Sequence, residues 1–464
     1  MRLGFYGATG TVTGSKYVLT RGPKVDDRIM IDCGLFQGLK RLRLLNWEAL
    51  PVDPMSIGAV ILTHAHIDHS GYLPRLSRTG FQSPIYCTPS TAKLLEILLL
   101  DSAYLQEEAA SYANNKGFSK HSPALPLYTI KDAEKCLKQV RAFPYDEVLE
   151  IGRGFKIRFH ANGHILGAAY LEIDIESDGK TTKLIASGDV GRYGSPVMPD
   201  PPSPEKADYL IVESTYGDRS HDDGDSKTAL RDVITRTMER DGVVVIPAFA
   251  VGRTQTILYV IRELEDEGAI PRLPVYIDSP MAIDVTMLYK EFASYLDAET
   301  RMLMEQGVAP LSPDRLDIRR SRDESRALND IRGGAVIISA SGMATGGRIL
   351  HHLTQRLPYK QNTILFVGFQ AEGTRGRLLL DGAEEIKIHG RYVPVRAEIA
   401  SIHGFSAHAD KNELLAWLGR MEKKPALTFI THGEPRSAQA LAAAVGEHLG
   451  MRTLIPEYKQ EVEL

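Results

Sequence analysis

Cysteine is scarce in this chain of 464 residues, and the three that occur, Cys33, Cys87 and Cys136, are far apart. An odd number at such spacing argues against a disulfide framework and a thiolate metal site, and it favours a reducing cytoplasmic setting. Long apolar runs are also missing, because none approaches the roughly 18 residues that a membrane-spanning helix needs. The first residues enter a strand pattern without the features of a signal peptide. We therefore expect a cytoplasmic protein with no membrane partner.

The chain also lacks a strong excess of charge of either sign. Its net charge of -4 gives no general attraction to nucleic acid or to an anionic membrane, so a polyanionic partner would need a local basic patch. Apolar residues make up 43% and charged residues 25% of the chain, which is ordinary for a globular protein. The length allows about two to three domains.

What the chain does have is a dense group of metal-ligand side chains directly after an apolar strand pattern at 59–62. The group consists of His64, His66, Asp68 and His69. His64 and His66 are two residues apart and can point the same way from an extended end, whereas Asp68 and His69 lie beyond a turn and can face a second position. Neutral imidazoles and a carboxylate without thiolates suit a catalytic zinc pair with room for water.

Further carboxylates and histidines stand where other predicted strands end. They are Asp32, His164, Asp189, Glu213, His408 and His432. Taken singly, such a residue is more often a cap or a turn residue than a ligand. Because the recurrence is what one sheet edge would assemble from distant parts of the chain, the set predicts a single site.

Glycines at positions 7, 10 and 14 offer an alternative interpretation. They follow a strand pattern, and Asp32 ends another strand about 20 residues on, as in a dinucleotide-binding fingerprint. That fingerprint requires a helix straight after the glycines. Here Lys16–Thr20 alternates as a strand, which disfavours nucleotide binding.

The periodicity of the sequence changes at about residue 217. From there, helical patterns alternate with short, continuously apolar strands such as 243–247, 335–339 and 363–366. Continuous apolar strands between helices are typical of a parallel sheet covered on both faces. After about residue 395 the chain returns to strand, loop and helix units that bear histidines. The pattern predicts a second α/β domain inserted into the first.

Together these motifs resemble the metallo-β-lactamase superfamily. The resemblance rests on Thr63–His69 together with Asp32, His164 and Asp189. Three further motifs, Glu213–Gly217, Phe405–His408 and Thr431–Glu434, are similar to those of its β-CASP branch, nucleases such as the mRNA 3′-end cleavage-and-polyadenylation endonuclease and its bacterial and archaeal relatives. The resemblance implies an α/β fold, an αββα sandwich with an inserted, mainly parallel β-CASP domain. The expected domains are 1–216 and 396–464 for the sandwich and 217–395 for the insertion.

The resemblance also implies two zinc ions per chain with a bridging hydroxide. The first ion would be held by His64, His66, His164 and Asp189, and the second by Asp68, His69, Asp189 and His432. General chemistry agrees, because two divalent ions about 3.5–4 Å apart can share a hydroxide and clamp phosphoryl oxygens. The implied reaction is hydrolysis of RNA to 5′-phosphate and 3′-hydroxyl ends.

Catalytic roles follow from the same resemblance. His408 would be the general acid that protonates the departing 3′ oxygen, and Glu213 would hold and charge it. Asp32 would orient a ligand imidazole, and Asp68 is counted with the catalytic residues as well as with the ligands. His403 lies nearby in the sequence and competes for the role of acid, although it fits no family motif.

The insertion offers a surface for the substrate, most simply single-stranded RNA. Two turns, 248–255 with one glycine and 339–348 with glycines and serines, each join a strand end to a helix start, where free N–H groups can meet phosphate. The expected RNA-binding residues are Arg253, Ser341, Gly342, Thr345, Arg348 and Arg375.

Alternatives from other classes remain. A glyoxalase II-like thioesterase shares the histidine cluster but not the insertion, a DNA-directed β-CASP nuclease typically lacks the counterpart of His432, and a non-catalytic RNA-binding subunit would have lost ligands. The sequence leaves open endonuclease or 5′-exonuclease action, the preferred RNA, and whether a second copy joins in a homodimer.

Overall fold

The computed structural model describes residues 1–117, 121–152, 154–177, 179–221 and 225–464. The chain divides into two compact units. Unit 1 contains Met1–Tyr193, Asp200–Ser220 and His408–Leu464, and unit 2 contains Gly194–Pro199 and His221–Ala407. The domain limits expected from the sequence stay predictions.

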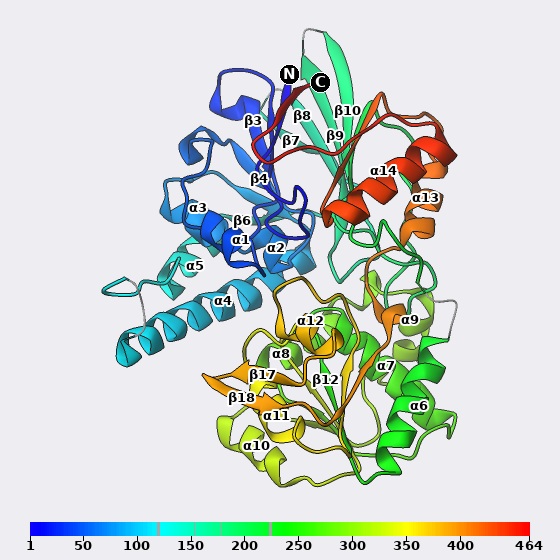
Figure 1. Ribbon diagram of the computed structural model, residues 1–464. Coiled ribbons are helices and arrows are strands. Elements are labelled where there is room, and N and C mark those ends of the chain that lie inside the picture. Colours follow the sequence, from blue (N-terminus) through cyan, green and yellow to red (C-terminus); the bar gives the residue numbers. More distant parts are fainter. Residues whose placement is uncertain (118–120, 153, 178, 222–224) are drawn as a thin grey trace. The chain divides into compact units, whose positions relative to one another are not determined.

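Unit 1 is built on two seven-stranded sheets (Figure 1). The first sheet has the order β22 (Glu461–Glu463), β1 (Arg2–Phe5), β2 (Tyr17–Thr20), β3 (Arg28–Ile31), β4 (Ala59–Ile61), β5 (Ile85–Cys87) and β6 (Val140–Ala142). The second has the order β21 (Thr453–Leu454), β20 (Leu427–Thr431), β11 (Tyr209–Glu213), β10 (Lys180–Ala186), β9 (Ala169–Ser177), β8 (Phe155–Ala161) and β7 (Leu149–Ile151). The strand at β2 leaves no helix after the early glycines, so the dinucleotide fingerprint is absent from these described residues.

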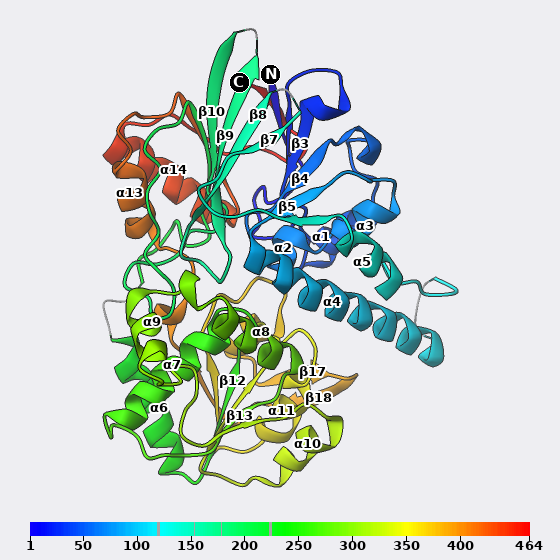
Figure 2. The same cartoon turned by 180° about the vertical axis from the view of Figure 1, so that it is seen from behind.

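The core of unit 1 lies between the two sheets. Alternating residues such as Leu3 and Phe5 on β1 and Ile157 and Phe159 on β8 are fully buried there. Helices α13 (Lys411–Gly419) and α14 (Pro435–Leu449) cover the outer face of the second sheet, where Trp417 is fully buried. Helices α1 (Lys40–Leu45), α2 (Ile67–Ser70), α3 (Leu73–Arg78), α4 (Pro89–Lys116) and α5 (Ile130–Leu137) belong to the half that contains the first sheet, as both opposite views show (Figures 1 and 2).

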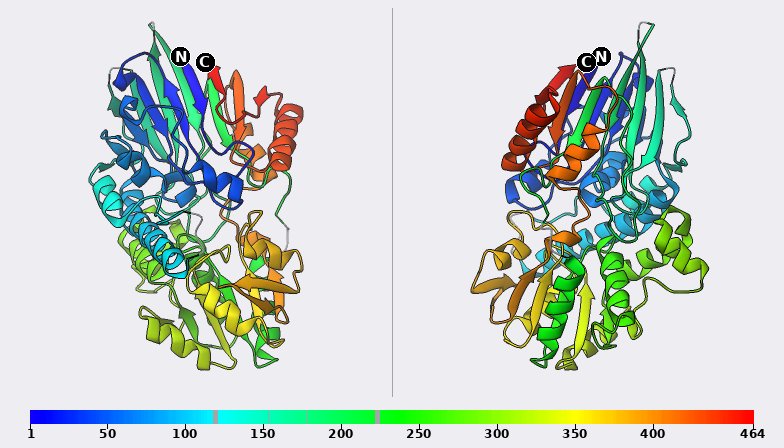
Figure 3. Two further views of the ribbon diagram at one scale, coloured as in Figure 1. Left: turned by 60° about the vertical axis from the view of Figure 1, so that its left-hand side comes forward. Right: turned by 90° about the vertical axis from the view of Figure 1, so that its right-hand side faces the viewer.

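Unit 2 has an all-parallel six-stranded sheet. Its order is β14 (Leu316–Ile318), β13 (Val275–Ile277), β15 (Ala335–Ser339), β12 (Val243–Pro247), β16 (Thr363–Phe366) and β19 (Glu398–Ser401). Helices α6 (Ser226–Met238) and α7 (Arg253–Asp266) lie on one face, and α11 (Ile349–Arg356), α12 (Arg375–Leu380) and the hairpin β17 (Glu385–Ile388) and β18 (Arg391–Pro394) lie on the other (Figure 3). Helices α8 (Pro280–Glu291), α9 (Ala298–Glu305) and α10 (Arg322–Ala327) complete the unit.

These sheets confirm the predicted fold class, an α/β protein with two mixed sheets and an inserted parallel sheet. Strands β12, β15 and β16 are continuously buried, as the apolar runs indicated. Among the helices of the described residues, none is both long enough and apolar enough to cross a bilayer.

The direction of the strands decides where the site forms. β3 pairs in parallel with β4, and β11 pairs in parallel with both β10 and β20. Parallel neighbours place their carboxyl ends at one edge of a sheet, and the residues just beyond those ends are therefore gathered together. Most of the predicted ligands lie in these positions, and His164 lies in the connection between the antiparallel strands β8 and β9.

Candidate metal centre

Five strand exits of unit 1 supply the predicted ligands. Asp32 follows β3, the cluster from His64 to His69 follows β4, His164 lies between β8 and β9, Asp189 follows β10, and His432 follows β20. The ligand atoms form two neighbouring groups, His64, His66, His164 and Asp189 on one side and Asp68, His69 and His432 on the other. The structure thus brings together every residue that the sequence singled out as a metal ligand.

The first group has the spacing of a tetrahedral site. His66 Nδ1 lies 3.2 Å from His64 Nε2 and 3.2 Å from His164 Nε2, and Asp189 Oδ2 lies 3.4 Å from His64 Nε2. Ligands about 2.0–2.1 Å from a tetrahedral zinc ion are about 3.3 Å from one another. The four side chains therefore fit a zinc ion.

The second group meets the other oxygen of Asp189. Asp189 Oδ1 lies 3.2 Å from His69 Nε2 and 3.3 Å from His432 Nδ1. His69 Nε2 and His432 Nε2 are 3.1 Å apart, and Asp68 Oδ2 is 3.7 Å from His432 Nε2. One carboxylate therefore faces both groups, one oxygen toward each.

Burial and neighbouring charges together set the protonation of these side chains. It lowers the pKa of His64 well below its ordinary value and the pKa of His66 to about 4, so both imidazoles are neutral and can donate a lone pair. Burial alone would raise the pKa of Asp189, but His432 and His69 hold it well below its usual range. The carboxylates of Asp189 and Asp32 instead raise the pKa of His69 well above its ordinary value, against the effect of burial. Imidazoles gathered around an ionised carboxylate form a nitrogen and oxygen donor set of the kind that zinc prefers.

Asp32 holds one imidazole in place from behind. Its Oδ2 lies 2.8 Å from His69 Nδ1, which leaves Nε2 directed at Asp189. Asp32 Oδ1 accepts a hydrogen bond of 2.8 Å from Thr63 N, and the side chain is 1% exposed. Asp32 has a φ of 56° and His432 a φ of 48°, a left-handed conformation that is uncommon outside glycine and often found at functional sites.

His408 and Glu213 form a second pair at the same edge. Glu213 is 1% exposed and accepts a 2.6 Å hydrogen bond from Val190 N, and its carboxylate lies 3.1 Å from His408 Nδ1. Burial works to lower the pKa of His408, but the carboxylates of Glu213 and Asp189 outweigh it and raise that pKa. His403 is exposed in the short 3₁₀ helix His403–Phe405 and belongs to unit 2.

Two supporting residues escaped the sequence analysis. Asn162 is fully buried and donates to Ser187 O at 3.0 Å and to Asp189 O at 2.7 Å, which fixes the backbone that carries the central carboxylate. Thr215 Oγ1 lies 3.2 Å from His432 Nδ1. Asn162 stands only two residues before His164 in a turn, but a polar residue in a turn is too common to single out from sequence.

Lys16 is the third residue that the sequence did not reveal. It is 1% exposed, and its ammonium donates to Gly14 O and Gly34 O and lies 4.6 Å and 4.8 Å from the ring centroids of Phe36 and Tyr72. A Cβ on Gly34 would lie 1.5 Å from Asp68 O, so this loop packs directly against the ligand-bearing turn. Strand alternation alone gave no sign that the side chain turns inward.

We expect Lys16 to make stability depend on pH in the alkaline range. Burial lowers the pKa of its ammonium from 10.5 to about 8. The neighbouring Cys33, with a pKa raised to about 12, and Tyr72, whose pKa is also raised, stay neutral across most of this range. Between pH 8 and 10.5 the unfolded lysine keeps a proton that the folded one has lost, so folding becomes more favourable as pH rises.

The expected gain is up to about 3 kcal/mol in the free energy of unfolding, relative to Lys16→Met. Denaturant unfolding of both proteins at pH 7.5 and pH 10 measures it, because groups that titrate in both proteins cancel in the difference. A Lys16→Met protein whose stability relative to the unmodified chain is the same at both pH values would contradict the expectation.

The predicted RNA-binding residues lie at the carboxyl edge of the sheet in unit 2. Arg253 begins α7 and is buried, Arg348 precedes α11, and Arg375 begins α12. Arg348 donates to Asp278 Oδ1 at 2.8 Å and to the carbonyls of residues 319 and 320, and Arg375 donates to Thr345 O at 3.1 Å. Ser341 Oγ and Thr345 Oγ1 are 2.9 Å apart, and Gly342 packs against Phe249.

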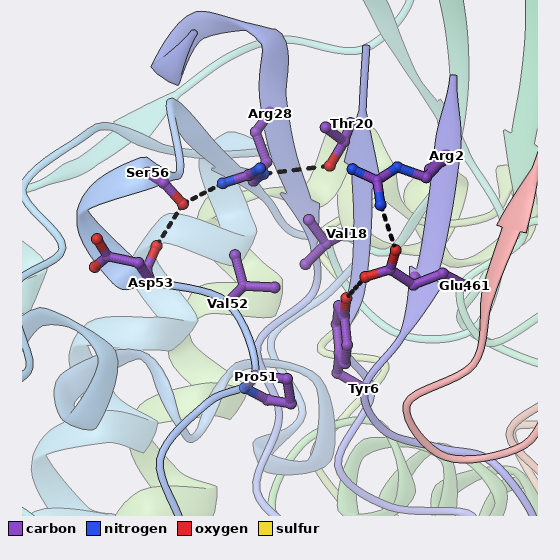
Figure 4. Close-up of a pocket in the computed structure, with 11 residues that line it drawn as sticks. Arg2, Tyr6, Val18, Thr20, Arg28, Pro51, Val52, Asp53, Ser56 and Glu461 are labelled. Carbon is purple, nitrogen blue, oxygen red and sulfur yellow. Dashed lines mark hydrogen bonds and ion pairs between the residues drawn. The ribbon is translucent and has the colours of Figure 1, made fainter. Parts of the chain in front are cut away.

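A separate pocket of about 250 Å³ lies on the first sheet of unit 1 (Figure 4). Glu461 accepts hydrogen bonds from Arg2 at 2.8 Å and from Tyr6 at 2.6 Å, and Arg28 donates to Thr20 and Ser56. Asp53, which also lines the pocket, accepts a hydrogen bond of 3.0 Å from Met55 N, so each charged group of the pocket already has a hydrogen-bond partner. The predicted metal ligands are not among the described residues that line it.

Three stretches of the chain match known families. Residues 12–247 match the metallo-β-lactamase superfamily, 254–379 the Beta-Casp domain, and 392–456 the Zn-dependent metallo-hydrolase RNA specificity domain. These matches follow the order expected from the sequence motifs.

Relatives match over most of the chain. Ribonuclease TTHA0252 of Thermus thermophilus is 36% identical over 95% of each chain. Transcription termination factor FttA of Methanosarcina mazei is 32% identical over 92% of this chain, which spans 66% of that factor. A solved structure of a protein of unknown function from Enterococcus faecalis V583 shares the fold, with a TM-score of 0.53 at 14% identity over 100% of this chain and 99% of its own.

Proposed function

Because the chain belongs to the metallo-β-lactamase superfamily, within its β-CASP family, and is a metal-dependent hydrolase, we propose that it is a zinc ribonuclease that leaves 5′-phosphate and 3′-hydroxyl ends. The observation that carries the proposal is the position of Asp189, whose two oxygens face two separate groups of ligands. The RNA-specificity match and the ribonuclease from Thermus thermophilus support RNA as the substrate, in RNA processing or decay.

In the proposed centre, His64, His66 and His164 would hold one zinc ion and Asp68, His69 and His432 a second, with Asp189 shared between the two groups. When bound, the ions would supply a hydroxide nucleophile at neutral pH and neutralise charge on the phosphoryl oxygens. Asp32 fixes the tautomer of His69 through the contact to Nδ1, so that Nε2 is the nitrogen offered to the metal. Asn162 keeps the backbone of Asp189 in place.

His408 is the proposed general acid. The 3′ oxygen is a poor leaving group unless it receives a proton as it departs. Glu213 holds His408 beside the ligands, where it can supply that proton. Glu213 and Asp189 raise the pKa of His408 against the effect of burial, which favours the protonated imidazole that a general acid needs. Glu213 accepts from the backbone at Val190 and Thr215, so its carboxylate is fixed before it meets the histidine.

Within unit 2, we propose that the turns at 248–255 and 339–348 bind phosphates of RNA. Pro247 and Ser339 are register partners on β12 and β15, so the two turns leave the sheet side by side. The charge of Arg348 is neutralised by Asp278, and its role would be to hold the turn while backbone N–H groups and Ser341 meet phosphate. Arg253 and Arg375 would add positive charge.

Labelled nucleic acids and small substrates test the proposed function. We expect the purified protein with added zinc to cut a 5′-labelled single-stranded RNA and to give products that a 5′-phosphate-dependent exonuclease degrades. Cleavage should stop with excess chelator and return on addition of zinc. Product lengths separate endonuclease from 5′-exonuclease action.

Parallel reactions with single-stranded DNA and with a thioester act as controls for the other hydrolase classes. Faster turnover of the thioester or of DNA than of RNA would contradict the proposal, as would RNA products that carry 3′-phosphate ends.

A further inference from the structure

Residues 40–47 of unit 1 carry exposed cations next to an exposed tryptophan. Helix α1 and the two residues after it expose Lys40, Arg41 and Arg43 on their surface. Leu44 is 53% and Trp47 50% exposed in the same segment. The chain has two tryptophans, and the other, Trp417, is fully buried. We call Lys40, Arg41, Arg43 and Trp47 the α1 strip.

Among the described residues, no partner neutralises the charges of the α1 strip. Over the described part of the chain, the side chains of Lys40, Arg41 and Arg43 form no ion pair or hydrogen bond, whereas other exposed arginines such as Arg2 pair with carboxylates. The acidic residue that follows the segment, Glu48, has its Oε2 3.9 Å from Lys459 Nζ. Three free cations within four positions form the local basic patch that a net-acidic chain needs to attract a polyanion.

The α1 strip is tied to the loop that supports the metal ligands. Asn46 is 7% exposed and bonds both backbone groups of Phe36, accepting from its N at 2.9 Å and donating to its O at 2.8 Å. Three residues before Phe36, Cys33 N donates to His69 O at 2.7 Å, and Leu35 N donates to Ile67 O at 2.9 Å.

We propose that the α1 strip binds single-stranded RNA next to the metal centre, with Trp47 stacked on a base and the three cations on successive phosphates. This proposal rests on the proposed function, because it assumes that RNA reaches the metal centre. Aromatic stacking combined with a basic track is the common way to hold a single strand without reading its sequence. The segment is less suited to an anionic membrane. Leu42 and Leu45 are partly buried, so only Leu44 and Trp47 are exposed enough to insert into a bilayer.

The stacking half of the proposal is tested by fluorescence and binding. A single-stranded oligoribonucleotide, titrated into the full chain with chelator present, should quench the tryptophan emission. Trp47→Ala should weaken binding about 5- to 100-fold, the effect of losing one stacked base, whereas Trp47→Phe should keep most of the affinity. Tyr112→Ala, which removes another half-exposed aromatic ring of unit 1, is the matched control and should leave binding unchanged.

The dependence of RNA affinity on salt concentration tests the electrostatic part of the proposal. A protein with Lys40, Arg41 and Arg43 all replaced by glutamine should lower the slope of log affinity against log salt by about 2, at roughly 0.7 for each phosphate of a single strand that a cation no longer neutralises. The control replaces Lys131, Lys135 and Lys138, three exposed cations at α5, by glutamine, which changes the net charge equally. An equal decrease of the slope in both proteins would overturn the proposal in favour of general charge attraction.

Kinetics distinguish this proposal from the proposed function. With zinc, the Trp47→Ala protein should show its effect on KM more than on kcat. If the unmodified chain cuts RNA but Trp47→Ala and the triple variant bind RNA as it does, the α1 strip has no role and the proposed function stands. If the unmodified chain cuts no RNA with zinc but binds RNA through Trp47, the proposed function is wrong and RNA binding by the α1 strip is supported. Binding of vesicles of anionic phospholipid in preference to RNA would overturn the proposal.

Discussion

Replacement of Asp189 by asparagine is expected to reduce RNA cleavage at least about a thousandfold, the scale of several kcal/mol of metal-ion stabilisation. The side chain keeps its shape, but the negative charge between the two ligand groups is lost. Each group then faces a neutral amide where it had a carboxylate oxygen, 3.4 Å from His64 and 3.2 Å from His69. Both proposed zinc positions are weakened by one substitution, because one residue serves both.

Elemental mass spectrometry measures the loss of bound zinc, and cleavage of labelled RNA measures the loss of activity. The matched control is Asp208→Asn, which removes a carboxylate from the same sheet of unit 1 where it bonds Lys183 N and Lys423. That protein should retain its zinc and its activity. Full zinc content in Asp189→Asn, or loss of cleavage without loss of zinc, would show that Asp189 does not join the two positions.

Replacement of His408 by alanine is expected to lower kcat for RNA by about 10²- to 10⁴-fold, the usual contribution of a general acid. Zinc content should be unchanged, because His408 Nδ1 is directed at Glu213, 3.1 Å away, and the residue belongs to neither ligand group. A phosphodiester with a p-nitrophenolate leaving group needs no proton on departure. We therefore expect His408→Ala to cleave it nearly as fast as the unmodified protein does.

His403→Ala is the companion experiment, because His403 is the other histidine of the segment that connects β19 with α13. It should leave RNA cleavage intact. If His403→Ala stops turnover while His408→Ala does not, the role of acid has been given to the wrong residue. If His408→Ala slows RNA and the p-nitrophenyl ester equally, the histidine serves the centre in another way than by protonating the leaving group.

Much of the fold and of the metal-binding cluster could be predicted from the sequence because the signals are local. The apolar run before His64 predicted a buried strand with ligands at its exit, and the continuous apolar strands after residue 217 predicted a parallel sheet. The family, the α/β fold and a zinc-dependent His and Asp cluster are confirmed. Residues such as Asp189 and His432 could be identified as ligands only from the whole set of motifs, since each alone is an ordinary strand-end residue.

What the sequence did not reveal depends on contacts between distant segments. Lys16 appears as a strand residue, yet its ammonium is enclosed by carbonyls and rings that arrive from residues 34–36 and 72. Asn162 is defined by the backbone of Asp189, 27 positions later. Trp47 is exposed although tryptophan is usually at least partly buried, and nothing in its neighbours predicts that.

The discontinuity of unit 1 has a consequence for the order of synthesis. A ribosome that has added residue 407 has produced all of unit 2 and the early ligands of unit 1, but neither His408 nor His432. The growing polypeptide therefore lacks part of the candidate site until these two histidines have been added, and β22, which pairs with β1, is added later still.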